Sequence, residues 1–144
     1  MIKNILQKIL IKAGKNYQID DNIPDALIFR TFYLRFCMMS RGILFLRRKI
    51  FIGKSVTILN KSNFQFGNNV TIESHTILDG YASQKIILGD NVKIGMYSKL
   101  LSTSHLATYG KGLKMGNNSA IGDFTHFGAP GGIEIGDDVI MGSY

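Results

Sequence analysis

Three histidines, His75, His105 and His126, are the side chains of this chain best suited to acid–base chemistry. A neutral imidazole can take a proton near neutral pH or bind a metal ion, so each is a candidate base or ligand. A single cysteine, Cys37, excludes an internal disulfide framework and a four-cysteine zinc cluster. What the histidines can do therefore depends on the elements that position them.

Composition and charge narrow the classes of function. The 144 residues, 45% of them hydrophobic and 19% charged, are enough for one domain with a buried core. The net charge of +7 belongs entirely to residues 1–49, which hold ten basic and three acidic residues, whereas residues 50–144 hold seven of each. The larger part therefore offers no basic face to a phosphate backbone, and we expect no nucleic-acid partner.

Residues 1–49 are predicted to form a basic, helical N-terminal arm. Apolar residues recur at helical spacing from Ile2 to Leu10, and Gly14 is expected to end that helix. A second helix is expected from about Pro24 to Leu46, and the arginines that interrupt it leave no window typical of a membrane span. This helix either packs on the next domain or a partner subunit, or lies in the interface of the inner membrane with its aromatic residues in lipid.

A repeat begins at residue 50. Five segments share one pattern. In order, it consists of an apolar residue, any residue, an apolar residue, Gly, two polar residues, Val or Ser, any residue, and a final apolar residue. The starts of the five segments are separated by 14, 22, 27 and 20 residues. The segments are Ile50-Phe-Ile-Gly-Lys-Ser-Val-Thr-Ile58, Phe64-Gln-Phe-Gly-Asn-Asn-Val-Thr-Ile72, Ile86-Ile-Leu-Gly-Asp-Asn-Val-Lys-Ile94, Leu113-Lys-Met-Gly-Asn-Asn-Ser-Ala-Ile121 and Ile133-Glu-Ile-Gly-Asp-Asp-Val-Ile-Met141.

The apolar residue before each Gly is followed by another six positions on, and the step continues to Leu78, Leu100 and Phe127. A six-residue step predicts a triangular solenoid in which each hexad is a short strand plus a corner. A β-sandwich would not predict a fixed step. We expect the aliphatic residues to point into the solenoid and Gly, Asn and Asp to form its corners. The spacing of 14 predicts an incomplete first coil, and the spacing of 27 predicts a coil that carries a nine-residue loop. Asp and Asn interchange between repeats, so Asp90, Asp123, Asp137 and Asp138 are predicted to form corners.

These segments closely resemble the hexapeptide-repeat acyltransferase family, and with the helical arm the chain looks most like bacterial polysaccharide O-acetyltransferases of the colanic-acid type. The resemblance implies a mainly β fold: a left-handed parallel β-helix over residues 50–144, preceded by the α-helical arm of residues 1–49. It also implies acetyl-CoA-dependent acetylation of a sugar hydroxyl in cell-surface polysaccharide biosynthesis. The enzyme is expected to be a cytoplasmic homotrimer, peripheral at the membrane through residues 1–49. In this mechanism a histidine removes the acceptor proton and backbone donors hold the oxyanion.

In similar proteins the catalytic histidine follows the stretch that matches Met141-Gly-Ser-Tyr144, so the resemblance implies a chain that is incomplete at its C-terminus. Within this sequence the candidate bases are His126 and, at the root of the loop over residues 106–112, His105, with His75 less favoured. The residues that bind CoA are not identified. The alternative function is a non-catalytic β-helical fragment or oligomerisation module.

The γ-class carbonic anhydrases share the expected fold and bind a metal through three histidines, two of them five residues apart. Here the gaps between histidines are 30 and 21 residues, so no metal site is expected. Tyr97, Tyr109 and Tyr144 could stack on a sugar, although isolated aromatic residues more often serve packing.

Overall fold

The structure is a computed structural model that describes residues 2–144, and the chain divides into two compact units, Met1–Cys37 and Met38–Tyr144. The first unit contains helix α1 (Ile2–Lys12) and the start of helix α2 (Asp25–Leu46), so both predicted helices are confirmed. Gly14, at φ +77°, ends α1, and the Lys15 amide donates to the Leu10 carbonyl at 2.9 Å.

The segment between the helices is tied to α1 by polar side chains. The Gln7 amide donates to the Tyr17 carbonyl and accepts from the Ile19 N–H, both at 2.9 Å. Lys3 Nζ donates to the Asp21 carbonyl at 2.6 Å and lies 4.0 Å from an Asp25 oxygen. Ile28, 5% exposed, is buried. The first unit is therefore held together more by polar contacts than by an extended core.

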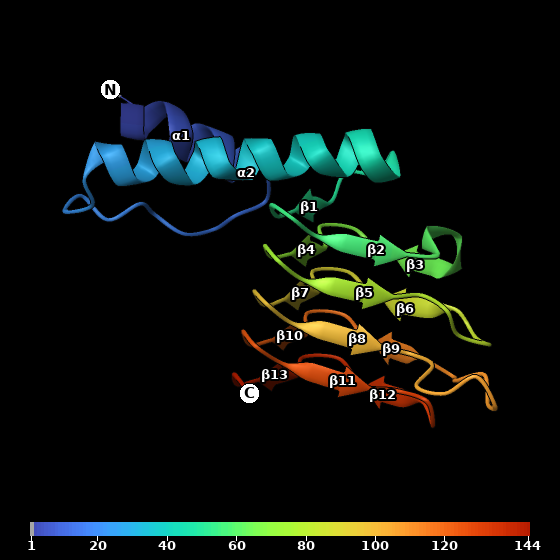
Figure 1. Cartoon of the computed structure of the whole chain (residues 1–144). Helices are drawn as coiled ribbons and strands as arrows, with labels where there is room; N and C mark the ends of the chain where they lie inside the picture. The colour runs from blue at the N-terminus through green and yellow to red at the C-terminus, as the bar shows by residue number, and fades with distance from the viewer. Residues whose placement is uncertain (1) are drawn as a thin grey trace. The chain divides into compact units, whose positions relative to one another are not determined.

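The second unit is a parallel β-solenoid with three sheets, as predicted (Figure 1). Sheet A contains β1 (Phe51–Ile52), β4 (Thr71–Ile72), β7 (Lys93–Ile94), β10 (Ala120–Ile121) and β13 (Ile140–Met141). Sheet B contains β2 (Thr57–Leu59), β5 (Ile77–Asp79), β8 (Lys99–Leu101) and β11 (His126–Gly128). Sheet C contains β3 (Phe64–Phe66), which follows the short 3-10 helix η1 (Lys61–Asn63), and β6 (Ile86–Leu88), β9 (Leu113–Met115) and β12 (Ile133–Ile135).

Two of the three corners of the solenoid have the same length in every coil, and the third does not. Each corner from sheet A to B, and each from C to A, has four residues, for example 95–98 and 89–92. Corners from sheet B to C span residues 60–63, 80–85, 102–112 and 129–132. All additional residues therefore fall at the B-to-C corner, which we call the variable corner, and it includes the loop predicted behind the spacing of 27.

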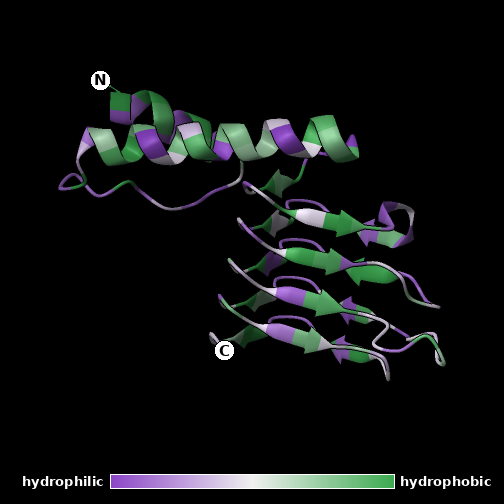
Figure 2. Ribbon diagram, in the orientation of Figure 1, coloured by the Kyte–Doolittle hydropathy of each residue, from purple (hydrophilic) through white to green (hydrophobic). Residues whose placement is uncertain are grey.

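Inward residues stack from coil to coil and form the core. Ile72, Ile94 and Ile121 are paired in register in sheet A, and each is at most 2% exposed. Leu78 and Leu100 pair in sheet B, each 1% exposed. Along β8 and β11 the ribbon changes from hydrophilic to hydrophobic within one strand, as expected for outward Lys99 and His126 followed by inward residues (Figure 2).

The first coil is incomplete, as the spacing of 14 residues predicted. It begins in sheet A, where Ile52 pairs with Ile72, and continues in sheet B, where Ile58 pairs with Leu78. No strand of sheet C precedes β1 among the described residues. The C-terminal turns of α2, and not another coil, cover the buried Ile50.

Within the second unit, the end of α2 covers the first coil. Leu46 packs against the core, and a Cβ on the buried Gly42 would clash with the Ile50 carbonyl. Arg41 and Arg48 donate guanidinium hydrogens to the Ile52 and Phe66 carbonyls at 3.3 and 3.1 Å. These donors satisfy carbonyls of the first coil.

Candidate functional site

His126 lies on the outer face of sheet B. It is the first residue of β11, its Cα is in register with that of Lys99 in β8, and Ile77 of β5 occupies the same row. Its imidazole is exposed, because Phe127, the next residue, takes the inward position. The face thus presents one base beside one ammonium group, about 5 Å apart at the backbone.

His105 belongs to the longest loop of the variable corner. Its Nδ1 accepts a hydrogen bond from the Ala107 N–H at 3.1 Å, and the backbone of His105 forms a bridge with Thr108. When Nδ1 accepts a hydrogen bond, a neutral imidazole carries its proton on Nε2. In this arrangement Nε2 is a donor, so His105 would have to break its local hydrogen bond to act as a base.

His75 lies at the corner from sheet A to B, in the left-handed conformation with φ 60°. Its ring stacks on Tyr97 at a centroid distance of 4.8 Å, Tyr97 stacks on Phe124 at 5.2 Å, and Phe124 stacks on Tyr144 at 5.7 Å. Interplanar angles of 6° and 7° make these four residues one ladder along the corner. We call it the aromatic ladder, and it gives His75 a packing role.

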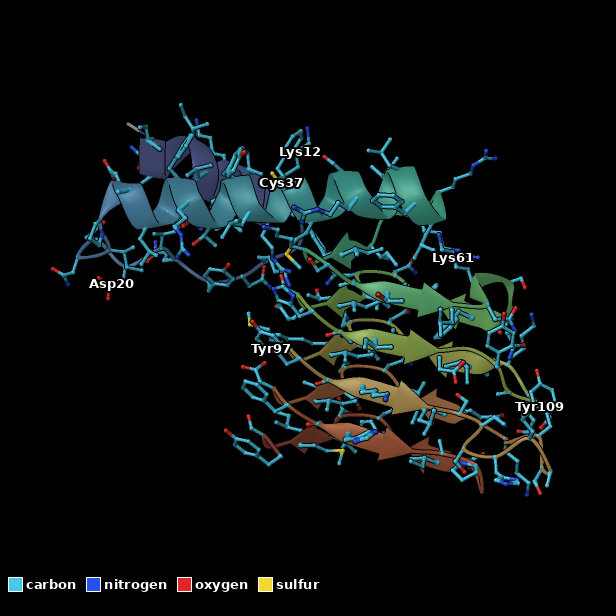
Figure 3. All side chains as sticks on the ribbon, in the orientation of Figure 1. Lys12, Asp20, Cys37, Lys61, Tyr97 and Tyr109 are labelled. Atoms are coloured by element: carbon cyan, nitrogen blue, oxygen red, sulfur yellow. The ribbon has the colours of Figure 1, made fainter. Side chains whose placement is uncertain are left out.

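The ladder limits sugar stacking. Both faces of the Tyr97 ring are covered by neighbouring rings, so Tyr97 cannot offer a face to a sugar. Tyr109 lies instead on the loop of the variable corner, far from Tyr97 in the side-chain view (Figure 3). The three tyrosines considered from the sequence therefore do not form one sugar-binding platform.

The aspartates of the repeat are engaged in corner hydrogen bonds. The carboxylate oxygens of Asp90, Asp123 and Asp137 accept from backbone N–H groups of the preceding coil at 2.6 to 2.8 Å. Asp138 accepts from the Asn118 side-chain amide at 3.1 Å. Their predicted role as corner formers is confirmed, and none is paired with a histidine as an acid–base partner would be.

The variable corner contains a shallow hollow of about 270 Å³. Its lining comes from three successive coils: Gln84, Lys111, Gly112, Lys114, Gly131, Gly132, Ile133 and Glu134. Lys114 is 3.5 Å from a Glu134 oxygen, and both side chains are substantially exposed. This volume lies just below the range of small-molecule sites, and the lining carries Lys111 and Lys114 together with the Glu134 carboxylate.

The structure does not bring the three histidines together. They lie on the flat face of sheet B, in the loop of the variable corner, and at the corner from A to B. Over residues 2–144, no group of three His, Cys, Asp or Glu side chains is placed to hold a metal ion.

The sequence analysis missed two features of these surfaces. The aromatic ladder had a signal, since His75, Tyr97, Phe124 and Tyr144 each follow an inward residue of sheet A by three positions. The hollow had none, because it depends on how loops of different length stack.

The chain matches no protein-family model, no curated protein and no solved structure.

Proposed function

We propose that the protein is an acyltransferase that uses acetyl-CoA to acetylate a sugar hydroxyl, working as a cytoplasmic homotrimer built on a left-handed β-helix of the hexapeptide-repeat type. The observation that carries the proposal is the solenoid: three parallel sheets repeat along the chain, with four-residue corners at two of the three sides, which is compatible with a hexapeptide-repeat β-helix. Because one fold hosts several functions, the chemistry must be tested at the histidines.

His126 is the favoured base in this chain. It is exposed on a flat sheet face, no hydrogen bond within the described residues 2–144 fixes its ring nitrogens, and Lys99 beside it would attract an anionic co-substrate. In the proposed step His126 takes the proton of the sugar hydroxyl as the oxygen attacks the thioester carbonyl. The carbon–sulfur bond then breaks, and the proton passes to the CoA thiolate.

The test measures release of CoA thiol from acetyl-CoA with a panel of mono- and oligosaccharides, in a Cys37→Ser background to remove the protein's own thiol. We expect His126→Ala to lower kcat by roughly a hundredfold or more. His75→Ala is the matched control, because its ring has a packing role, and it should retain activity. If His105→Ala alone abolishes turnover, the loop histidine is the base.

A non-catalytic module is the second candidate, favoured by the dispersed histidines and the occupied aspartates. Thermal unfolding with and without CoA separates the two functions, since a ligand that binds only the folded state raises its stability. Absence of both turnover and CoA-dependent stabilisation would establish the module. Light scattering of the full chain tests the trimer, which requires three times 16.0 kDa.

A further inference from the structure

The first unit exposes apolar side chains in two helical rows. On α1, Ile2, Ile5 and Ile9 are spaced i, i+3, i+7 and are 48, 54 and 51% exposed. On α2, Phe29, Tyr33 and Phe36 are spaced i, i+4, i+7 and are 68, 58 and 71% exposed. This spacing places each set on one face of its helix. We call the two sets the α1 stripe and the α2 stripe.

The stripes differ from the apolar residues of the solenoid. Phe64 and Phe66 in β3 are 8 and 6% exposed, whereas the aromatic side chains of the α2 stripe are mostly in solvent. Apolar side chains grouped on one exposed face mark a surface that contacts something else.

The charge around the stripes indicates what they contact. Lys8 and Lys12 lie on α1, Arg30 lies on α2, and the whole excess of seven positive charges falls within residues 1–49. An exposed apolar face with basic residues at its flanks is the pattern of a helix that lies in an anionic membrane interface. No helix in the described part of the chain is long and apolar enough to cross a membrane.

We propose that the α1 and α2 stripes dock the protein on the surface of an anionic phospholipid bilayer, with Lys8, Lys12 and Arg30 against the headgroups. A second copy of the same surface is the less suitable occupant, because two strongly positive segments repel each other. The proposal is independent of the acetyltransferase function and requires only the helices.

Co-sedimentation with vesicles tests it on the full chain. Vesicles of phosphatidylglycerol and phosphatidylcholine should bind the protein at low ionic strength, and pure phosphatidylcholine vesicles should bind it much more weakly. Phe29→Ser with Tyr33→Ser should lower the partition coefficient at least roughly tenfold. The matched control, Leu59→Ser with Ile77→Ser, removes two exposed apolar side chains from sheet B and should bind as the unaltered protein does.

The chain contains no tryptophan, so a single introduced tryptophan can report on its own surroundings. This second measurement does not depend on whether the double variant folds. Phe29→Trp places a single tryptophan in the α2 stripe, and its emission should shift to shorter wavelength and be quenched by brominated acyl chains on anionic vesicles. Tyr109→Trp, in the loop of the variable corner, should show neither change.

Three results would overturn the proposal. One is equal binding to anionic and neutral vesicles, another is unchanged binding of the α2 double variant, and the third is an unshifted tryptophan emission from the Phe29→Trp variant. If vesicles do not bind but the double variant lowers the mass seen by light scattering, the stripes hold copies of the chain together instead.

Discussion

The two units place the same kinds of residue in opposite environments. In the solenoid the large apolar side chains of the middle coils are almost completely buried, and polar corner residues bond to the next coil. In the first unit the aromatic residues of the α2 stripe are exposed, and the loop is held by a few long polar side chains. A repeating element thus supplies its own neighbours, whereas the helices of the first unit keep apolar side chains exposed.

The largest effect is expected where the solenoid is most buried. Ile94, 2% exposed, pairs with Ile72 and Ile121, so Ile94→Asp would bury an unpaired charge and cost more than about 4 kcal/mol of unfolding free energy. Urea denaturation followed by circular dichroism measures the loss. A soluble variant with an unchanged midpoint would contradict the inward position.

The second largest loss of stability is expected where the backbones of successive coils approach closely. A Cβ on Gly95 would run into the backbone of Gly122 and Asp123, whereas one on Gly128 meets nothing within 4 Å. Gly95→Ala should therefore cost about 3 kcal/mol, and Gly128→Ala should be neutral or slightly stabilising. Equal denaturation midpoints for the two variants would refute the tight contact.

A smaller loss of unfolding free energy is expected where the side chains of Asn69, Asn91 and Asn118 bond to one another from coil to coil. Asn91, at φ 57°, accepts from the Asn69 amide at 2.8 Å and donates to Asn118 at 2.9 Å. Asn91→Ala should cost about 2 kcal/mol, because it loses both hydrogen bonds and fits the left-handed region poorly. Asn91→Gly should cost less, since glycine adopts that conformation freely. A glycine variant as unstable as the alanine variant would assign the whole effect to the side chain.

The smallest effect on stability belongs to the first unit. Phe29 is 68% exposed, so Phe29→Ser should change the free energy of unfolding by less than about 0.5 kcal/mol. A large loss in the same denaturation assay would mean that Phe29 packs in a core, and the contrast between the units would fail.

Most of the fold could be predicted because the six-residue step is a direct consequence of strand and corner geometry. The element that covers the first coil could not be predicted, because the repeat pattern of Ile50-Phe-Ile-Gly carries no information about helix α2, which covers Ile50 in the structure. The positions of the histidines followed from the repeat only in part. The outward place of His126 follows from inward Phe127, but the Nδ1 hydrogen bond of His105 depends on a loop with no repeat to guide it.

The variable corner is the part of the solenoid whose length differs from coil to coil, whereas the strands and the other two corners keep a constant length. Its segments of four, six and eleven residues leave the strands on either side paired in register, as β5–β8 and β6–β9 show. Lengthening a surface loop costs little, about 0.6 kcal/mol for each doubling. Foreign peptides grafted within residues 106–109 should therefore be displayed without disturbing the scaffold.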